Sequence, residues 1–288
     1  MRRKVDYLRA NDLKSAVTAL ASGPRKILAG GTDVFPALQD RPLEGAVLDI
    51  SGISELAQVG FDGEYWRIGA AASWSDVIKA DLPPAFDALK AAAREVGSIQ
   101  IQNRATLVGN LCNASPAADG VPPLLTLDAE IELASLRGVR HLPLCDFIIG
   151  NRRTALAADE MVAAVRIPLA SSGGRSGFIK LGARRYLVIS ITMVAGRFDL
   201  DDAGIITNAA VAIGACSEVA LRMPDIELAL IGTTVAGASA RVSTSQFARL
   251  SPIDDVRSSA TYRRQASFAA VRHLIDEMIM STSGGGRA

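Results

Sequence analysis

Two adjacent glycines in the stretch Ala29-Gly30-Gly31-Thr32-Asp33 constrain the fold of this chain more than any other feature. The short apolar run at residues 26–29 predicts a strand that ends in this tight turn. Because glycine has no Cβ, the backbone N–H groups of such a loop can converge on one anion. A plain turn is the alternative, but a helix opening at Thr32-Asp33 favours a phosphate or pyrophosphate site.

A second stretch, RATLVGNLCNASPAAD, occupies residues 104–119. We expect it to form a long loop that combines Gly109 with the polar set Thr106, Asn110, Asn113, Ser115 and Asp119. Such groups can enclose a dinucleotide without a cluster of lysines. Simple Asx and Ser turns are the alternative for the asparagines and Ser115, and a helix cap near Val121 is the alternative for Asp119.

Several classes of protein are excluded. No G-x-G-x-x-G follows a predicted strand, which disfavours a Rossmann site, and the absence of G-x-x-x-x-G-K-[ST] excludes a P-loop NTPase. Lysine and arginine number 31 against 30 acidic residues, so the charge gives no case for nucleic acid or a membrane surface. The sequence has neither a secretory h-region near its start nor an apolar run of about 18 residues, so we expect a cytoplasmic protein without membrane insertion.

Hydrophobic periodicity predicts a mixed order of elements. A helix capped by Asn11 or Asp12 begins at Leu13, and Ser73 with Asp76 forms the capping box of another helix. A helical stripe runs from Phe86 to Val96, and the C-terminal helix covers about 259–280. Strands are expected at residues 26–29, 46–50, 65–70, 130–134 and 161–167, and as an antiparallel sheet at 178–181, 189–198 and 209–215.

The glycine loop and the second stretch together resemble the FAD-binding subunit of the molybdenum hydroxylases, the family of xanthine dehydrogenase and aerobic carbon monoxide dehydrogenase. The resemblance continues through residues 147–154 (FIIGNRRT), Asp159-Glu160, residues 165–168, residues 178–182 and Arg184-Arg185. It implies an α+β fold, with a two-lobed FAD-binding domain of the PCMH/vanillyl-alcohol-oxidase type at 1–170 (lobes about 1–55 and 56–170). A C-terminal α+β domain is implied at 175–282, after the linker candidate at 171–174.

The resemblance also implies an extended FAD whose pyrophosphate is held by main-chain N–H groups of both glycine-containing loops. Asp119 would accept from sugar or ribityl hydroxyls, Val162 would pack on the cofactor, and Lys180 would lie near the pyrimidine end of the flavin. A solvated strand face is the alternative for Lys180. The implied cofactor-binding residues are Ile27, Leu28, Ala29, Gly30, Gly31, Thr32, Asp33, Val34, Thr106, Gly109, Asn110, Asn113, Ser115, Asp119, Val162 and Lys180.

The remaining candidates are an aromatic residue, a cysteine and the two histidines. Tyr186 either covers the flavin ring or is a buried edge tyrosine, and Cys112 is expected to be a small buried hydrophobe. The two histidines, His141 and His273, lie outside the glycine loops. We therefore expect noncovalent FAD rather than an 8α-histidyl linkage, and neither a catalytic acid or base nor a metal ligand on this chain.

Cysteine usage points to partner subunits. Cys112, Cys145 and Cys216 are far apart and form no C-x-x-C pair, whereas a cluster normally needs four spaced ligands. This also argues against the benzoyl-CoA reductase branch, whose flavin subunit holds an extra cluster. The resemblance then implies that [2Fe–2S] clusters and molybdopterin sit on an iron–sulfur small subunit and a molybdopterin large subunit, in an (αβγ)2 assembly.

The predicted function is that of an electron-transfer subunit, which passes electrons from iron–sulfur clusters on a partner through FAD to an external acceptor. One alternative is a free-standing FAD-dependent oxidoreductase, which would need its own substrate pocket and a proton donor near the flavin. Another is a nucleotide-binding assembly subunit without redox activity.

Overall fold

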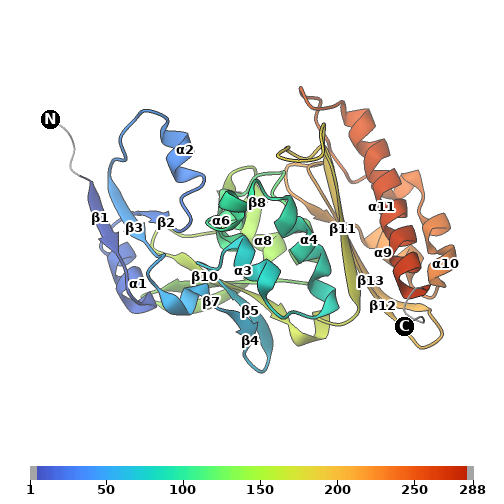
Figure 1. The fold of residues 1–288 in the computed structure, drawn as a ribbon, viewed down its shortest axis with the longest axis horizontal. Helices are drawn as coiled ribbons and strands as arrows, with labels where there is room; N and C mark the ends of the chain where they lie inside the picture. Colours follow the sequence, from blue (N-terminus) through green and yellow to red (C-terminus); the bar gives the residue numbers. More distant parts are fainter. Residues whose placement is uncertain (1–4, 284–288) are drawn as a thin grey trace. The chain divides into compact units, whose positions relative to one another are not determined.

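The structure is a computed structural model that describes residues 5–283 (Figure 1). The chain divides into two compact units, each built from stretches that are distant in sequence. Unit 1 contains the described residues up to Asp81, together with Val96–Ala114 and Ala129–Pro168. Unit 2 contains Leu82–Glu95, Ser115–Asp128 and the described chain from Leu169 onward.

Unit 1 contains a parallel sheet of order β1-β3-β2, an antiparallel sheet of order β4-β5-β10-β6-β7, and the pair β8-β9. Its strands are β1 (Asp6–Arg9), β2 (Lys26–Leu28), β3 (Ala46–Asp49), β4 (Val59–Phe61), β5 (Tyr65–Gly69), β6 (Glu130–Ser135), β7 (Gly138–Pro143), β8 (Ile148–Gly150), β9 (Arg153–Thr154) and β10 (Met161–Pro168). Its helices are α1 (Leu13–Ala21), α2 (Val34–Leu38), α3 (Trp74–Lys79), α5 (Ile99–Gln102), α6 (Leu107–Asn113), α8 (Leu144–Phe147) and the 3-10 helix η1 (Ser54–Ala57).

Local sequence signals account for where several of these helices begin. The Asp12 carboxylate accepts a hydrogen bond from the Ser15 N–H at the start of α1. At α3, the Ser73 hydroxyl accepts from the Asp76 N–H while the Asp76 carboxylate accepts from the Ser73 N–H. Both predicted caps are therefore confirmed.

Unit 2 contains an antiparallel sheet of order β11-β12-β13-β14, which confirms the predicted antiparallel arrangement. The strands are β11 (Arg175–Leu181), β12 (Thr192–Leu200), β13 (Ile206–Gly214) and β14 (Leu221–Arg222). The helices are α4 (Asp87–Glu95), α7 (Val121–Thr126), α9 (Pro224–Leu230), α10 (Val235–Ala238) and α11 (Ala260–Ser283), with the 3-10 helices η2 (Pro84–Phe86), η3 (Leu169–Ser171), η4 (Ser239–Arg241) and η5 (Thr244–Phe247).

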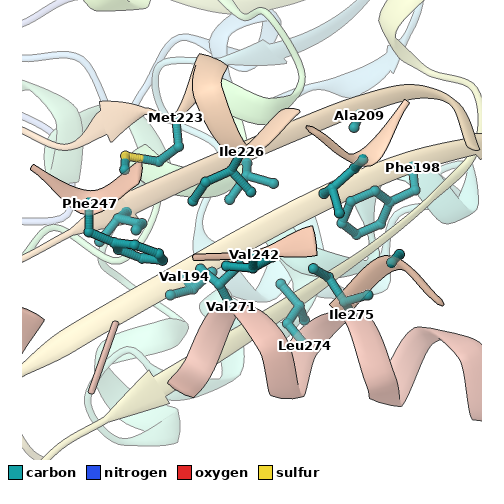
Figure 2. Packing of buried hydrophobic residues seen from close by; sticks show 14 of the residues in the cluster. Val194, Phe198, Ala209, Met223, Ile226, Val242, Phe247, Val271, Leu274 and Ile275 are labelled. Carbon is teal, nitrogen blue, oxygen red and sulfur yellow. The ribbon is translucent and has the colours of Figure 1, made fainter. Parts of the chain in front are cut away.

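Side chains of β12 alternate between two packed faces, as the period of a strand requires. Val194 and Phe198 enter an apolar core with residues of α11 that include Val271 and Leu274 (Figure 2). Arg197, on the opposite face, donates from Nε to the Thr126 carbonyl of α7 at 2.9 Å. The sheet of unit 2 is thus covered by α11 on one face and by α7 on the other.

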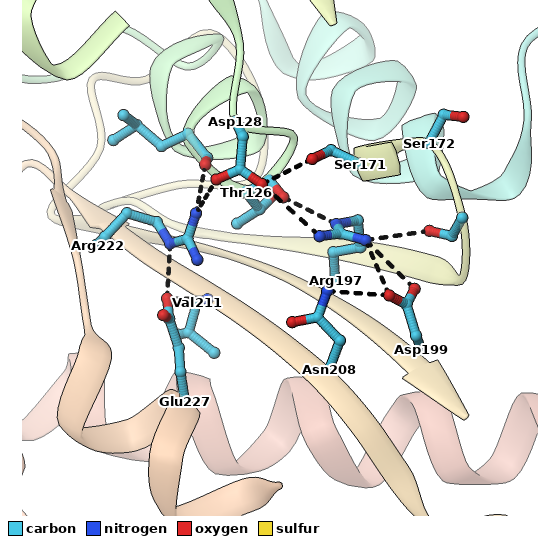
Figure 3. Close-up of polar contacts among 12 residues, drawn as sticks. Thr126, Asp128, Ser171, Ser172, Arg197, Asp199, Asn208, Val211, Arg222 and Glu227 are labelled. Carbon is cyan, nitrogen blue, oxygen red and sulfur yellow. Dashed lines mark hydrogen bonds and ion pairs between the residues drawn. The ribbon is translucent and has the colours of Figure 1, made fainter. Parts of the chain in front are cut away.

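Two arginines fix the C-terminal end of α7 to this sheet (Figure 3). Arg222 Nη1 donates to the Leu125 carbonyl and to Asp128 Oδ1, both at 2.8 Å, while its Nε donates to Glu227 Oε1 at 2.6 Å. Arg197 approaches Asp128 from the other side, at 3.9 Å, and is only 2% exposed. The contacts made by this cluster are internal to unit 2, so we assign it a structural role.

The prediction of a long loop at 104–119 is wrong for its first half, because residues 107–113 form α6. Thr106 caps this helix, and its buried face of Leu107, Val108 and Leu111 supplies the packing that a short helix needs. The strand expected to begin at 189 begins at Thr192. Within residues 5–283, no helix combines the length and the apolar character required to cross a bilayer.

Candidate functional site

In unit 1 the glycine loop lies directly against the start of the second stretch. A Cβ placed on Gly30 would come within 1.8 Å of the Arg104 carbonyl oxygen, so only glycine allows this approach. Gly31 has φ of +75°, and a Cβ there would come within 2.6 Å of the Phe35 ring. Two regions about seventy residues apart in the sequence therefore lie against each other because Gly30 lacks a side chain.

The loop also leaves donors free. Within residues 5–283, the backbone N–H groups of Gly30, Gly31 and Thr32 donate to no acceptor of the chain. Each residue is only partly buried. Unpaired N–H groups beside a position that excludes Cβ are what an anion such as a pyrophosphate requires.

Helix α6 carries the next group of predicted residues. Thr106 Oγ1 accepts from the Gly109 N–H at 2.9 Å, and the Thr106 carbonyl accepts from the Asn110 N–H at 3.1 Å. Asn113 Nδ2 donates to Asp33 Oδ1 at 3.4 Å, which joins the end of α6 to the glycine loop. The structure thus brings Asn113 to the glycine loop and places Thr106, Gly109 and Asn110 on the same helix as Asn113.

The other predicted residues of unit 1 lie in the strands and the helix around the glycine loop and in β10. Ile27 and Leu28 lie in β2, ahead of Ala29, and Val34 is the first residue of α2. Val162 is 4% exposed and lies in β10, opposite Leu133, next to a shift in register. Val162 therefore packs inside unit 1.

In unit 2, Lys180 and Asp119 form a buried ion pair. Lys180 Nζ donates to Asp119 Oδ2 at 2.9 Å and to the Glu95 carbonyl at 3.3 Å, and the Lys180 side chain is 6% exposed. The Ser190 hydroxyl donates to Asp119 Oδ1 at 3.2 Å. Burial raises the pKa of Asp119, an effect that Lys180 and Ser190 oppose by favouring the carboxylate. The alternative of a solvated strand face is wrong for Lys180.

The structure also tests the predictions made for Tyr186, Cys112 and Ser115. Tyr186 is 68% exposed, so the alternative of a buried edge tyrosine is wrong. Cys112 is exposed, contrary to the expectation of a buried residue, because it follows Leu111 and lies off the buried face of α6. Ser115 Oγ accepts from the Ala117 N–H at 3.2 Å, as the turn alternative for this residue predicted.

Some residues at these two places were not predicted individually. Arg152 has φ of +58°, and it donates to the Asn113 side chain and from its N–H to the Ala114 carbonyl at 2.8 Å. It lies in the stretch at 147–154 that carried part of the resemblance, which was the available signal. Ser190 had no such signal, because its role depends on contacts with Asp119 and Arg257 that are distant in the sequence. Phe35 contacts Gly31, four residues before it, but no motif singled it out.

Comparison with known proteins identifies the family to which this chain is similar. Residues 3–170 match the family model of the FAD binding domain in molybdopterin dehydrogenase, and residues 178–278 match that of the CO dehydrogenase flavoprotein C-terminal domain. The chain is 32% identical over 280 residues to the putative xanthine dehydrogenase FAD-binding subunit XdhB of Escherichia coli (strain K12), which covers 94% of this chain and 92% of the relative. It is 36% identical over 214 residues to the nicotinate dehydrogenase FAD-subunit of Eubacterium barkeri, covering 73% and 72%.

A solved structure agrees in fold. A chain of the Cu,Mo-CO dehydrogenase in its cyanide-inactivated form superposes with a TM-score of 0.85 at 23% identity, covering 96% of this chain and 98% of that chain. The predicted α+β fold, an FAD-binding domain followed by a C-terminal domain, is confirmed. The chain belongs to the family of FAD-binding medium subunits of the molybdenum hydroxylases, which includes xanthine and CO dehydrogenases, and is a flavoprotein component of an oxidoreductase with FAD as its cofactor.

Proposed function

We propose that this chain is the electron-transfer subunit of a molybdenum hydroxylase complex, receiving electrons from iron–sulfur clusters on a partner and delivering them to an external acceptor. The observation that carries the proposal is the contact between the glycine loop and the second stretch in unit 1, with the N–H groups of Gly30, Gly31 and Thr32 free within the described residues. FAD supplies the redox chemistry when it is bound. The chain's own residues bind and orient it.

The roles that we assign follow from the donors and charges of each side chain. The N–H groups of the glycine loop hold the pyrophosphate, and the polar residues of α6 are assigned to the same cofactor. Asp119 is assigned to sugar or ribityl hydroxyls rather than to phosphate, because like charges repel. Lys180 is assigned to the flavin, where an ammonium group stabilises the negative charge gained on reduction. The noncovalent attachment of FAD belongs to the same proposal.

The proposal includes the partners and the domain limits. An iron–sulfur small subunit and a molybdopterin large subunit would complete an (αβγ)2 complex, in line with relatives that are named as FAD or medium subunits. We place the FAD-binding domain at 1–170 and the C-terminal domain at 175–282, limits supported by the ends of the two family-model matches.

Removal of FAD from the purified complex tests the direction of electron flow. Nicotinate and xanthine, which the names of two relatives suggest as substrates, would serve as the first probes. We expect the FAD-free complex to retain bleaching of its iron–sulfur bands on addition of a working substrate. Reduction of the external acceptor should be lost, and added FAD should restore it.

Two outcomes would contradict the proposal. Delivery of electrons to the acceptor at an unchanged rate without FAD would remove this subunit from the exit path. Purification of the chain as an active enzyme without larger partners would instead favour a free-standing flavoenzyme.

A further inference from the structure

A pair of arginines in unit 2 holds the backbone at the point where the 182–190 loop enters strand β12. Arg257 Nη1 donates to the Ser190 carbonyl at 3.0 Å, and Arg263 Nη1 donates to the next carbonyl, that of Ile191, at 2.6 Å. Arg263 is fully buried at 0% exposure and also donates to the Ala215 carbonyl at 3.1 Å. Two consecutive peptide groups are thus fixed by two charged side chains.

One carboxylate joins the two arginines. Asp255 Oδ1 accepts from Arg263 Nη2 at 2.7 Å, and Asp255 Oδ2 accepts from Arg257 Nε at 3.0 Å and Nη2 at 2.5 Å. Hydrogen bonds from Arg257 hold the pKa of the Asp255 carboxyl well below its ordinary value. The ionised carboxylate therefore orients both guanidinium groups. We call Asp255, Arg257 and Arg263 the arginine clamp.

The clamp reaches the buried ion pair through a single residue. Ser190 is 1% exposed; its carbonyl is held by Arg257, and its hydroxyl donates to Asp119 Oδ1. Asp119 in turn accepts from Lys180 on its other oxygen. A shift of the Ser190 backbone would therefore remove a hydrogen bond from Asp119 and alter the partner that holds the Lys180 ammonium group.

The loop that the clamp closes has few anchors of its own. The Ile191 N–H donates to the Leu181 carbonyl at 2.7 Å, and Arg184 donates from Nη2 to the Leu187 carbonyl at 2.5 Å. Leu187 has φ of +52°, and Leu187 and Ile189 are 57% and 64% exposed. A loop with little burial depends on fixed ends for its order.

We propose that the arginine clamp is a positioning device, which fixes the end of the 182–190 loop and, through Ser190, sets the Asp119–Lys180 pair for FAD. The FAD part rests on the proposed function, since it requires Asp119 and Lys180 to face the cofactor. The loop part rests on the contacts within unit 2 alone.

The test variant is Asp255→Asn, which keeps the shape of the side chain and removes its charge. Asp199→Asn is the matched control, because Asp199 Oδ2 pairs at 3.2 Å with Arg197, another buried arginine of unit 2. Within residues 5–283, no hydrogen bond or ion pair joins Asp199 or Arg197 to Ser190 or Asp119. Ser190→Ala removes only the hydroxyl link. Asp255→Glu keeps the charge and serves as the rescue.

Two measurements on the full chain separate the two parts. Trypsin cleavage after Arg184 or Arg185, both exposed, reports loop order without FAD. It should accelerate in Asp255→Asn but stay unchanged in Asp199→Asn and Ser190→Ala. FAD titration into apoprotein should give a Kd about tenfold weaker for Asp255→Asn and Ser190→Ala than for Asp199→Asn, with recovery in Asp255→Glu.

The cleavage rates test the role of the clamp in the loop, and the FAD affinities test its link to the cofactor. Equal cleavage rates in Asp255→Asn and Asp199→Asn would overturn the loop role. Equal FAD affinity in Ser190→Ala and the unaltered chain would overturn the link to the cofactor. An unaltered chain that binds no FAD would refute the proposed function and the FAD part together, while the trypsin comparison would still decide the loop part.

Discussion

Single residues of this chain matter where the backbone leaves no room for a side chain. Gly30 meets a backbone carbonyl, whereas Gly31 meets the ring of Phe35, which is 53% exposed and can move. The cost of a substitution at Gly31 comes mainly from its φ of +75°, which side chains rarely allow. Gly30 is therefore the stricter of the two positions in steric terms.

We expect Gly30→Ala to weaken FAD binding by at least about 100-fold, because a clash with Arg104 would displace the loop and two or more charge-assisted hydrogen bonds would be lost. Gly60→Ala is the control, since a Cβ at Gly60 meets no atom within 4 Å. FAD titration of both apoproteins, with thermal unfolding to verify the fold, provides the measurement. Normal FAD affinity in Gly30→Ala would make the loop an ordinary turn.

Glu160 gives a prediction about pH. Hydrogen bonds from Arg140 Nε and Nη2, both at 2.8 Å, lower the pKa of this buried carboxyl to about 2. A pKa lowered in the folded state means that the ionised form adds stability above its ordinary pKa of 4.5, and that this stability is lost as the pH falls toward 2.

Glu160→Gln should therefore lower the free energy of unfolding at neutral pH by roughly 1–2 kcal/mol. This is less than the full pKa shift implies, because the partly exposed arginines are screened by solvent. Urea denaturation at several pH values would measure the difference between variant and unaltered chain. The difference should shrink as the pH is lowered through the range between 4.5 and 2. A difference that does not change with pH would contradict the assigned role of the charge.

At the scale of elements, short helices are held by polar contacts at their ends as well as by packing. Every residue of α7 is buried, yet its last turn depends on Arg222 and Arg197, which bind carbonyls of Leu125 and Thr126. Glu227 of α9 and Asp128 neutralise Arg222. This charged cluster ties α7 to the strands and to α9.

Arg222→Ala should destabilise the chain by about 2–3 kcal/mol, because Glu227 loses its charged partner and the Leu125 carbonyl loses one of its two donors in a partly buried setting. Arg175→Ala, at an exposed arginine of the same sheet, should change stability by less than about 0.5 kcal/mol. Urea denaturation of both variants makes the comparison. Equal free energies of unfolding for Arg222→Ala and Arg175→Ala would show that the charged cluster does not stabilise the packing of α7.

Elements governed by local rules were predictable, while contacts across the fold were not. The caps at Asp12 and Ser73 depend on residues three positions apart, so the sequence contains the whole signal. Helix α6 was missed because glycine and asparagine favour a loop locally, whereas burial of Leu107 and Leu111 decides the outcome. Exposure of Cys112 follows from the same helix.

In the candidate site, too, local features were predictable from the sequence and long-range contacts were not. Glycine spacing predicted the loop, but the contact of Gly30 with Arg104 is a property of the folded unit. Lys180 and Asp119 were singled out separately by resemblance, and their pairing appears only in the structure. Ser190 had no sequence signal at all, since a serine beside a strand has no distinctive pattern.

At the scale of the whole molecule, the chain has the residues to hold FAD but too few thiols for a cluster. It carries three cysteines, of which Cys112 and Cys145 are exposed and Cys216 is buried, whereas a [2Fe–2S] cluster normally takes four cysteine ligands. On the proposed function, FAD in the separated chain would receive no electrons from a substrate that is oxidised on another subunit.

We expect FAD bound to the isolated chain to remain oxidised when the substrate that reduces the complex is added, because the proposed function places the oxidation of that substrate on another subunit. Dithionite should reduce the same flavin, which shows that the bound cofactor is competent. The intact complex, mixed with the same substrate, should show loss of flavin absorbance after that of the iron–sulfur bands. Stopped-flow absorbance of the chain and of the complex under anaerobic conditions makes the comparison. Direct bleaching of the isolated chain by substrate would mean that the chain holds its own substrate site, and the free-standing flavoenzyme would then be the better description.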